Sequence, residues 1–460
     1  MKIKSNDTIA AISTAFGNAG IAILRISGKE SLPILKKVFE PKGAKFKSRK
    51  FYYGKIVGKK REVIDEVLAV FFKAPKSYTR EDMAEIHCHG GFVTAKKILE
   101  EALDEDARMA SPGEFTERAF LAGRIDLTQA EAIADIIYAK SDKAQRVAEE
   151  QLEGSLKKEI RHILKLVLDV YSHALTDIDF PEEDIPELTK TDILKKIKKP
   201  ISEIEKLLRG AQVGTIYKEG LKAALVGLPN VGKSSLLNAL VKDARAIVTD
   251  VPGTTRDVLE DQIEIKGLLV RLFDTAGITK TEDKVEKEGV SRSFKAIKEA
   301  DMVFLIVEKF GEIKKFFSHL KPRLKKDLES KKTIIVRNKV DLKRTPGVFK
   351  EPEKLNVISV CETSAKTRKG IKGLEKALQE ELEKFDSESG VLVTNLRQKK
   401  LLERASASLE AVEKLSKNNE ALDKILLELD EARQSLEEII GEKVTLSLLE
   451  KVFSRFCVGK

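Results

Sequence analysis

The spacing of apolar residues along this chain changes from region to region, and each change marks a different kind of structure. In the N-terminal part, short apolar runs at 9–12, 21–26 and 67–72 predict strands, whereas the segment 94–103 has the spacing of a helix. Strands and helices mixed in this way predict an α+β domain that extends to about residue 122.

Two later regions have apolar residues at every third or fourth position, which is the period of an amphipathic helix. The first region carries them at Ala130, Ile133, Ile137, Leu152, Leu156, Ile160, Ile163 and Val167 and, after an expected break at 180–186, at Ile193, Ile197, Ile204 and Leu208. The second region carries them at Leu422, Ile425, Leu429, Ala432, Leu436 and Ile439. Gly210, Gly214 and Gly220 close the first region and predict a linker.

Between the helical regions, strand-like and helix-like segments alternate, which predicts an α/β domain. Because helical patterns flank this domain on both sides, we interpret them as one all-helical domain that an insertion interrupts. The predicted boundaries are 1–122 for the N-terminal domain, 123–216 and 383–460 for the two parts of the helical domain, and 217–382 for the inserted domain.

Composition narrows the choice of partners and compartment only a little. The chain has 460 residues and a net charge of +10, so a nucleic-acid partner and a mixed surface of Lys and Glu are about equally compatible with it. No apolar stretch reaches the length of a membrane span, and no signal-peptide core is present, so we expect a cytoplasmic protein. Cys88, Cys361 and Cys457 are far apart, which argues against disulfides and a structural zinc site.

The strongest motif is a phosphate-binding loop. Residues 227–234 fit the pattern G-x-x-x-x-G-K-[ST] and lie between an apolar run at 223–226 and a helical segment at 235–240. In such a loop, backbone N–H groups surround the phosphates, Lys233 neutralises their charge, and the hydroxyl of Ser234 reaches Mg²⁺. Strand, loop and helix in this order predict a nucleotide site.

Two later motifs indicate that the nucleotide is GTP. Asn338-Lys-Val-Asp341 follows a strand-like run, and the carboxylate of Asp341 can accept two N–H bonds from guanine, a donor pattern that adenine lacks. Thr363-Ser-Ala-Lys366 follows another such run and completes the expected guanine pocket.

Two further motifs belong to the metal and the γ-phosphate. Asp274-Thr-Ala-Gly277 ends an apolar run; its aspartate would hold Mg²⁺ through water, and the N–H of Gly277 would contact the γ-phosphate. Gly253-Thr-Thr-Arg-Asp257 would supply a threonine to the same metal. The four motifs in this order predict a Ras-like P-loop GTPase domain.

One position differs from Ras-type enzymes. Ile278 takes the place of the glutamine that orients the attacking water, and an aliphatic side chain cannot hydrogen-bond water. The nearby carboxylates are Glu282, Asp283, Glu286 and Glu288. From their pattern alone, they are more simply explained as solvated helix residues.

His87-Cys88-His89 has residue types that bind metals. Adjacent residues on a strand point to opposite faces, so the three cannot easily bind one ion, and we predict no metal there.

Over its whole length, the chain resembles the MnmE, or TrmE, family of tRNA-modification GTPases. The segments that carry the resemblance are 7–11, 20–28, 77–82, 85–91, 112–120, 126–131 and the terminal Phe456-Cys-Val-Gly-Lys460. The resemblance implies a cytosolic homodimer that forms a heterotetramer with MnmG, a partner that uses FAD and NADH. Together they would add an aminomethyl or carboxymethylaminomethyl group to C5 of the wobble uridine in certain tRNAs.

The resemblance also implies a folate site. The one-carbon unit would come from methylene-tetrahydrofolate, and the N-terminal domain would bind this folate, or its 5-formyl form, and dimerise. On the matching positions, Arg25, Glu85, Arg124 and Lys460 would contact the folate. From the residues alone, Arg25 and Glu85 are better explained as surface ion-pair residues.

For the GTPase domain, the resemblance implies activation by K⁺. The K⁺ would be held by Asn230, Thr249, Val251 and Thr254, and Mg²⁺ by Ser234 and Thr255, while Glu286 would orient the attacking water beside the catalytic Lys233. The residues expected to contact GTP are Asn230, Val231, Gly232, Lys233, Ser234, Ser235, Thr249, Asp250, Val251, Pro252, Gly253, Thr254, Thr255, Asp274, Thr275, Ala276, Gly277, Asn338, Lys339, Asp341, Ser364, Ala365 and Lys366.

Two alternatives stay open. Cys457 could attack C6 of the uracil ring, because the basic neighbours Arg455 and Lys460 favour a thiolate, or it could be a small buried residue that fixes the C-terminal tail. The whole chain could also be a ribosome-assembly GTPase of the Era or Der kind. Those proteins carry an RNA-binding domain after the GTPase domain, and no G-x-x-G loop in a KH-like context follows residue 382 here.

Overall fold

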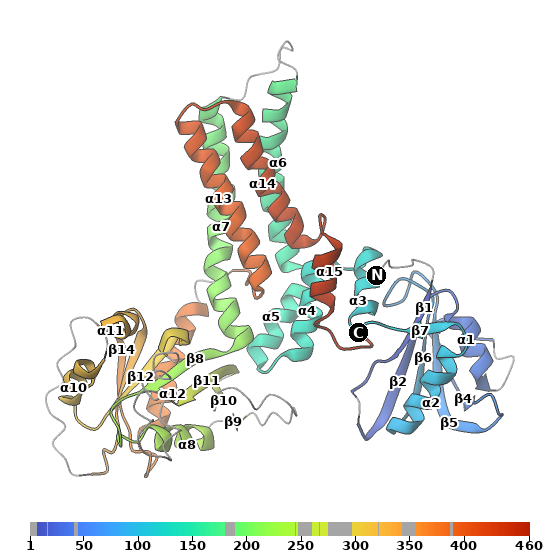
Figure 1. The fold of residues 1–460 in the computed structure, drawn as a ribbon, viewed down its shortest axis with the longest axis horizontal. Coiled ribbons are helices and arrows are strands. Elements are labelled where there is room, and N and C mark those ends of the chain that lie inside the picture. Colours follow the sequence, from blue (N-terminus) through green and yellow to red (C-terminus); the bar gives the residue numbers. More distant parts are fainter. Residues whose placement is uncertain are drawn as a thin grey trace. The chain divides into compact units, whose positions relative to one another are not determined.

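The computed structural model describes residues 7–15, 17–40, 45–179, 189–243, 245–246, 260–265, 267–274, 297–320, 322–342, 355–386 and 390–460. Its contacts divide the chain into two compact units, 1–134 with 151–160 and 436–460, and 135–150 with 161–435. An N-terminal sheet with its helices, a set of long helices and a second sheet with its helices are visible in Figure 1. This agrees with the predicted combination of an α+β part, a helical part and an α/β part.

The N-terminal sheet is mainly antiparallel. Its strands lie in the order β3-β4-β5-β6-β2-β1-β7, and only β1 and β7 pair in parallel. Their bounds are β1 Thr8–Ile12, β2 Ala19–Ser27, β3 Phe39–Glu40, β4 Phe51–Val57, β5 Val63–Phe72, β6 Met83–Gly90 and β7 Ala107–Met109. The helices of this region are α1 Ser31–Val38, α2 Phe92–Leu103 and α3 Glu114–Leu121. The three strands and the helix predicted here are confirmed as β1, β2, β5 and α2.

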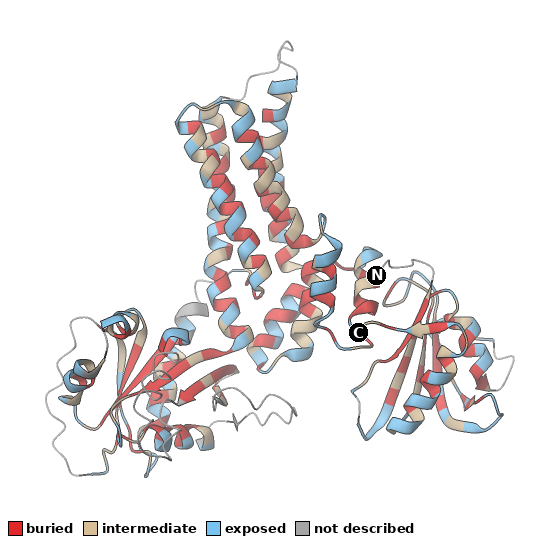
Figure 2. Cartoon of the chain, in the orientation of Figure 1, coloured by how far each residue is buried: buried red, intermediate tan, exposed pale blue. Residues whose placement is uncertain are grey.

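The two faces of this sheet differ in polarity. On β2, Leu24 and Ile26 are buried in a core with Ile98 of α2, and Ile86 of β6 joins the same core. Because side chains alternate along a strand, Arg25 between Leu24 and Ile26 lies on the opposite face. Figure 2 shows the resulting alternation of buried and less buried residues along the strands.

The C-terminal segment packs within the same unit. Helix α15, Leu446–Phe453, contacts α3, and Leu449, Phe453 and Phe456 share an apolar cluster with Ala119 and Leu127. Beyond the helix, the backbone of the tail runs against residues near β1 and α3. The hydroxyl of Ser13 donates to the carbonyl of Gly459 at 2.9 Å, and the N–H of Phe115 donates to the carbonyl of Lys460 at 3.2 Å.

The long helices form the helical part of the chain. They are α4 Leu127–Tyr138, α5 Asp142–Leu152, α6 Ser155–Asp179, α7 Lys190–Glu219, α13 Leu396–Lys417 and α14 Leu422–Ile440. The predicted stripe on α14 is confirmed, because its positions from Ile425 to Ile439 are buried. α7 packs along α13 although about 180 residues separate them in the sequence. No helix in the described part of the chain is long and apolar enough to cross a membrane.

The predicted glycine linker is wrong. Gly210 and Gly214 lie inside α7, which continues to Glu219, and only Gly220 lies outside it, as the helix cap. A side chain at Gly214 would place its Cβ 2.3 Å from the carbonyl oxygen of Val393, and at Gly210 3.0 Å from that of Val391. These glycines therefore let α7 approach a neighbouring backbone. The predicted break at 180–186 lies outside the described residues.

The second sheet has the strand order β14-β13-β12-β8-β11-β10-β9, in which β14 through β11 are parallel and β10 and β9 antiparallel. Its strands are β8 Leu221–Val226, β9 Arg245–Ala246, β10 Glu260–Ile265, β11 Leu268–Asp274, β12 Met302–Val307, β13 Lys332–Arg337 and β14 Asn356–Glu362. Its helices are α8 Lys233–Asp243, α10 Glu312–His319, α11 Pro322–Glu329 and α12 Ile371–Asp386. This is the predicted α/β arrangement.

Both faces of this sheet are covered. Leu225 of β8 packs with Leu236 of α8 and Leu374 of α12, whereas Val226 packs with Ile313 of α10 and Leu324 of α11. The loops that follow the parallel strands gather at one edge, which is where α/β sheets bind ligands.

Candidate functional site

The phosphate-binding loop joins β8 to α8 in the second sheet. Asn230 and Gly232 have φ values of 63° and 91°, so both lie in the left-handed region. A Cβ on Gly232 would lie 2.4 Å from Nδ2 of Asn338, which only glycine avoids. The ammonium of Lys233 donates to the carbonyls of Gly227 and Leu228 at 3.1 and 3.0 Å, so it lies against the loop. A phosphate-binding loop requires a backbone of this kind, with its N–H groups free to turn towards one point.

Asn338 connects the predicted guanine motifs to the phosphate loop. Its side chain is 2% exposed, and its Nδ2 donates to the carbonyl of Val231 at 3.0 Å. Its Oδ1 accepts from the backbone N–H of Ala365 at 3.2 Å and from the hydroxyl of Thr363 at 3.4 Å. One buried amide therefore holds together three loops that lie far apart in the sequence.

Asp341 lies beside the loop at 364–366 with its carboxylate accessible. The hydroxyl of Ser364 donates to its Oδ1 at 2.6 Å. That hydrogen bond is the main reason why the pKa of Asp341 lies below its usual value, and the positive charges of Lys366 and Lys339 act in the same direction. Asp341 is therefore an ionised acceptor, which is the group that the N–H donors of guanine require.

Other predicted GTP-site residues lie outside the described residues. These are 249–255, 275–277 and Glu286. They include the predicted Mg²⁺ ligand Thr255 and the predicted K⁺ ligands Thr249, Val251 and Thr254. Asp274 is the last residue of β11 and pairs in register with Leu225 of β8.

In the N-terminal unit, the structure brings Arg25 and Glu85 together. The two residues are paired in register across β2 and β6, and the guanidinium of Arg25 donates to Glu85 Oε1 through Nε at 3.0 Å and Nη2 at 2.9 Å. Burial acts to raise the pKa of Glu85. The hydrogen bond from His87 and the charge of Arg25 outweigh burial, so the pKa of Glu85 lies below its usual value.

Lys460 is brought to this ion pair by the C-terminal tail. The Nη1 of Arg25 donates to the carbonyl of Gly459 at 3.4 Å. Burial, followed by the positive charge of Arg25, holds the pKa of Lys460 below its usual value. The effect of Arg25 shows that two positive charges lie close together here, an arrangement that favours an anionic group.

Arg124 reaches the same place through Tyr78. Its Nη1 donates to the carbonyl of Tyr78 at 3.1 Å, and its guanidinium carbon lies 4.7 Å from the centre of the Tyr78 ring. The guanidinium carbon of Arg25 lies 5.3 Å from that ring centre and 5.6 Å from that of Phe115. Sequence reasoning missed Tyr78 and Phe115 as site residues, although both lie in segments that carry the family resemblance.

Two other cysteine and histidine predictions can be compared with the structure. Cys457 is exposed, so the alternative in which it is a small buried residue is wrong. Its tail is fixed instead by Phe456 and Gly459, which are buried. Cys88 is buried, and burial raises its pKa to about 11, while His87 contacts Glu85 and His89 contacts Asp65. The described residues contain no cluster of side chains that could hold a metal.

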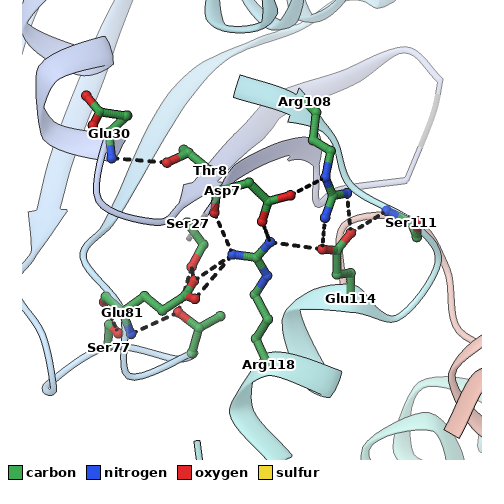
Figure 3. A network of polar contacts seen from close by, with 11 residues as sticks. Asp7, Thr8, Ser27, Glu30, Ser77, Glu81, Arg108, Ser111, Glu114 and Arg118 are labelled. Atoms are coloured by element: carbon green, nitrogen blue, oxygen red, sulfur yellow. Dashed lines mark hydrogen bonds and ion pairs between the residues drawn. The ribbon is translucent and has the colours of Figure 1, made fainter. Parts of the chain in front are cut away.

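An ionic network centred on the buried Arg118 and Glu114 lies in the same unit (Figure 3). Arg118 donates to Asp7 at 2.7 Å, Glu114 at 3.0 Å and Glu81 at 3.2 Å, and Arg108 donates to Asp7 and Glu114 as well. The network connects β1, the loop that carries Tyr78, and α3, which carries Phe115. It therefore links the backbone segments that carry the two aromatic residues.

Comparison with known proteins identifies the family. The family model described as the MnmE helical domain matches residues 127–457, and the model described as the GTP-binding protein TrmE N-terminus matches residues 8–124. The chain belongs to the MnmE family.

Curated MnmE relatives match over nearly the whole chain. The tRNA modification GTPase MnmE of Alkaliphilus oremlandii is 44% identical over 99% of this chain and 99% of its own length. The protein of the same name from Bacillus subtilis is 43% identical over 99% of this chain and all of its own length. Among solved structures, the G domain of the T. maritima FeoB iron transporter is 25% identical, with 35% of this chain and 97% of that chain covered and a TM-score of 0.24.

Proposed function

We propose that this member of the MnmE family is a GTP hydrolase that takes part in modifying the wobble uridine of tRNA. The observation that carries the GTP part is the buried amide of Asn338, which joins the phosphate loop to the loop beside Asp341. This amide supports the proposal because it links the loops that would contact the phosphates and the guanine. The tRNA part is supported by the full-length likeness to tRNA modification GTPases.

The proposed ions and catalytic groups follow the family pattern. Ser234 and Thr255 would hold Mg²⁺, and Asn230, Thr249, Val251 and Thr254 would hold K⁺. Such cations supply charge compensation at the β- and γ-phosphates. Within the described residues, Lys233 is positioned to place its ammonium over the phosphate loop. Glu286 would orient the attacking water in place of the glutamine that Ile278 replaces.

The N-terminal unit would bind the folate that donates the one-carbon unit. Arg25, Arg124 and Lys460 surround one place with positive charge, and Glu85 offers a single ionised acceptor beside them. Folates carry both carboxylates and a ring with N–H donors, so this combination suits them. The folate would be methylene-tetrahydrofolate or its 5-formyl analogue, and the active assembly would be a homodimer joined to MnmG with its FAD and NADH.

The GTPase proposal is tested by steady-state hydrolysis in KCl and in NaCl at equal ionic strength. We expect faster turnover in KCl, because K⁺ would stabilise charge that develops in the transition state. Asp341→Ala is the control for the site, since it removes the guanine acceptor and should raise the KM for GTP. Equal, slow turnover in both salts would contradict the K⁺ mechanism.

The tRNA proposal is tested by mass spectrometry of wobble uridines from cells that lack this gene. Loss of the aminomethyl-type modification is expected, with return of the modification when the gene is restored. Unchanged wobble uridines would refute the proposal.

The alternative of an Era- or Der-like ribosome-assembly GTPase is not favoured, because α13, α14 and α15 follow the GTPase domain within the match to the MnmE helical domain.

A further inference from the structure

Tyr78 is a neighbour shared by two of the proposed folate-binding arginines. The guanidinium carbons of Arg124 and Arg25 lie 4.7 and 5.3 Å from the centre of its ring. These distances are within the range at which the negative face of an aromatic ring attracts a cation. Two guanidinium groups that approach one ligand repel each other, and a ring that attracts both of them offsets part of that repulsion.

The ring of Tyr78 is held in place from its far end. Its hydroxyl forms a hydrogen bond of 2.9 Å with the hydroxyl of Thr116, which is completely buried. Tyr78 is also partly buried against the apolar clusters that include Phe115 and Ala119. A side chain fixed at both ends can align the groups that pack on it.

The backbone of Tyr78 is held by its neighbours in the sequence. Thr79 is completely buried, and its hydroxyl lies 2.6 Å from that of Ser27. The Ser27 hydroxyl donates to the carboxylate of Glu81 at 2.7 Å. Glu81 in turn accepts from Arg118 of the ionic network (Figure 3). The side chains of Thr79 and Glu81 are thus committed to this network, while Tyr78, which precedes them, contacts Arg25 and Arg124.

Arg124 depends on Tyr78 more than Arg25 does. Arg25 has a second partner in Glu85, whereas within the described residues the polar and ring contacts of the exposed Arg124 side chain are those with Tyr78. The carbonyl of Tyr78 occupies one N–H of Arg124, and its ring fixes the plane of the guanidinium. The other N–H donors of that plane are left to face a ligand.

We propose that Tyr78 is a positioning residue that aligns the guanidinium groups of Arg124 and Arg25 for folate binding. The inference rests on the proposed folate site and adds to it a residue that acts through the two arginines. It differs from a purely structural role, because the loop is already fixed by Thr79 and Glu81. Removal of the ring should therefore change ligand affinity and leave the fold intact.

The test is calorimetric titration of the full-length protein with 5-formyltetrahydrofolate. Tyr78→Leu should weaken binding by about tenfold, and Tyr78→Phe, which keeps the ring, by no more than about twofold. Tyr53→Leu is the control, because Tyr53 is an exposed tyrosine on β4 of the same unit and its hydroxyl bonds Glu66 rather than either arginine. Circular dichroism and the GTP hydrolysis rate should be unchanged in all three variants.

A double-mutant cycle distinguishes positioning from packing. In the Arg124→Gln background, the loss caused by Tyr78→Leu should shrink markedly, because the guanidinium that the ring aligns is gone. An equal loss in both backgrounds would overturn the proposal, as would wild-type affinity in Tyr78→Leu. Tyr78→Met, which fills similar space without a ring, provides the same comparison if the leucine variant does not fold. Absence of binding to the wild-type protein would instead refute the folate site itself.

Discussion

Glu114 shows how a buried carboxylate can stabilise the N-terminal unit. It accepts hydrogen bonds from Arg108 through Nη1 at 2.8 Å, from Arg118 at 3.0 Å and from the backbone N–H of Ser111 at 2.9 Å (Figure 3). Burial alone would raise the pKa of Glu114. The hydrogen bonds and the charge of Arg118 outweigh burial and hold that pKa below its usual value.

We predict that Glu114→Gln destabilises the protein at neutral pH by about 3 kcal/mol, because it removes the negative charge that pairs with the buried Arg118 and the partly buried Arg108. A carboxylate whose folded pKa is depressed stabilises the fold above its unfolded pKa, and that stability is lost as the pH falls through the folded pKa. The difference between wild type and variant should therefore shrink towards about pH 4 and below. Urea unfolding at pH values across this range measures the difference in the free energy of unfolding. Hydrogen exchange in α3 then measures the local effect.

Glu117→Gln on the same helix is the matched control for this prediction. Burial, together with the charge of Glu114, raises the pKa of Glu117, so its charged form opposes folding. Its replacement should be neutral or stabilising at neutral pH, and this effect should fade as the pH falls. A loss of stability in Glu114→Gln that is the same at every pH would show that the carboxylate charge contributes nothing.

At the level of elements, close packing of α7 depends on a residue without a side chain. The carbonyl oxygen of Val393 lies so close to Gly214 that a Cβ at this position would be 2.3 Å from it. In α12, Gly373 has no atom within 4 Å of the place of a Cβ. The two helical glycines therefore have opposite requirements although both interrupt a helical pattern.

We predict that Gly214→Ala destabilises the packing of α7 by about 1–3 kcal/mol, because the backbone at 391–393 must shift. Gly373→Ala should instead stabilise α12 by up to about 1 kcal/mol, since alanine has the higher helix propensity. Hydrogen exchange of α7 and α12 in the two variants measures each effect locally. Equal protection of α7 in wild type and Gly214→Ala would contradict the role of this glycine.

These same elements show what a sequence can and cannot predict. The period of apolar residues located α6, α7 and α14, because burial of one helical face is written into local spacing. Gly214 was misread as part of a linker, since its partner Val393 lies far away in the sequence. Asn338 and Asp341 were found from a local motif after a strand. Tyr78 was missed because its role arises only when Arg25 and Arg124, from different elements, meet at its ring.

For the whole molecule, the N-terminal unit is completed by the last residues of the chain. Gly459 has a φ of 94°, and a Cβ there would lie 2.4 Å from the carbonyl oxygen of Ile12. The tail that passes through this position brings Lys460 to Arg25. An insertion of the GTPase domain thus separates in sequence two segments that form one proposed folate site.

We predict that removal of residues 457–460 weakens binding of 5-formyltetrahydrofolate by at least about tenfold, since one cation and the anchor of Arg25 are lost. GTP hydrolysis should continue at the wild-type rate, because the phosphate loop belongs to the other compact unit.

Cys457→Ser is the control, as its exposed side chain can change while the tail backbone stays in place. If the serine variant binds folate normally but no longer supports tRNA modification, the thiol acts in the chemistry; if it is fully active, the tail serves only to complete the site. Wild-type folate affinity in the truncated protein would show that the two ends of the chain do not form one site.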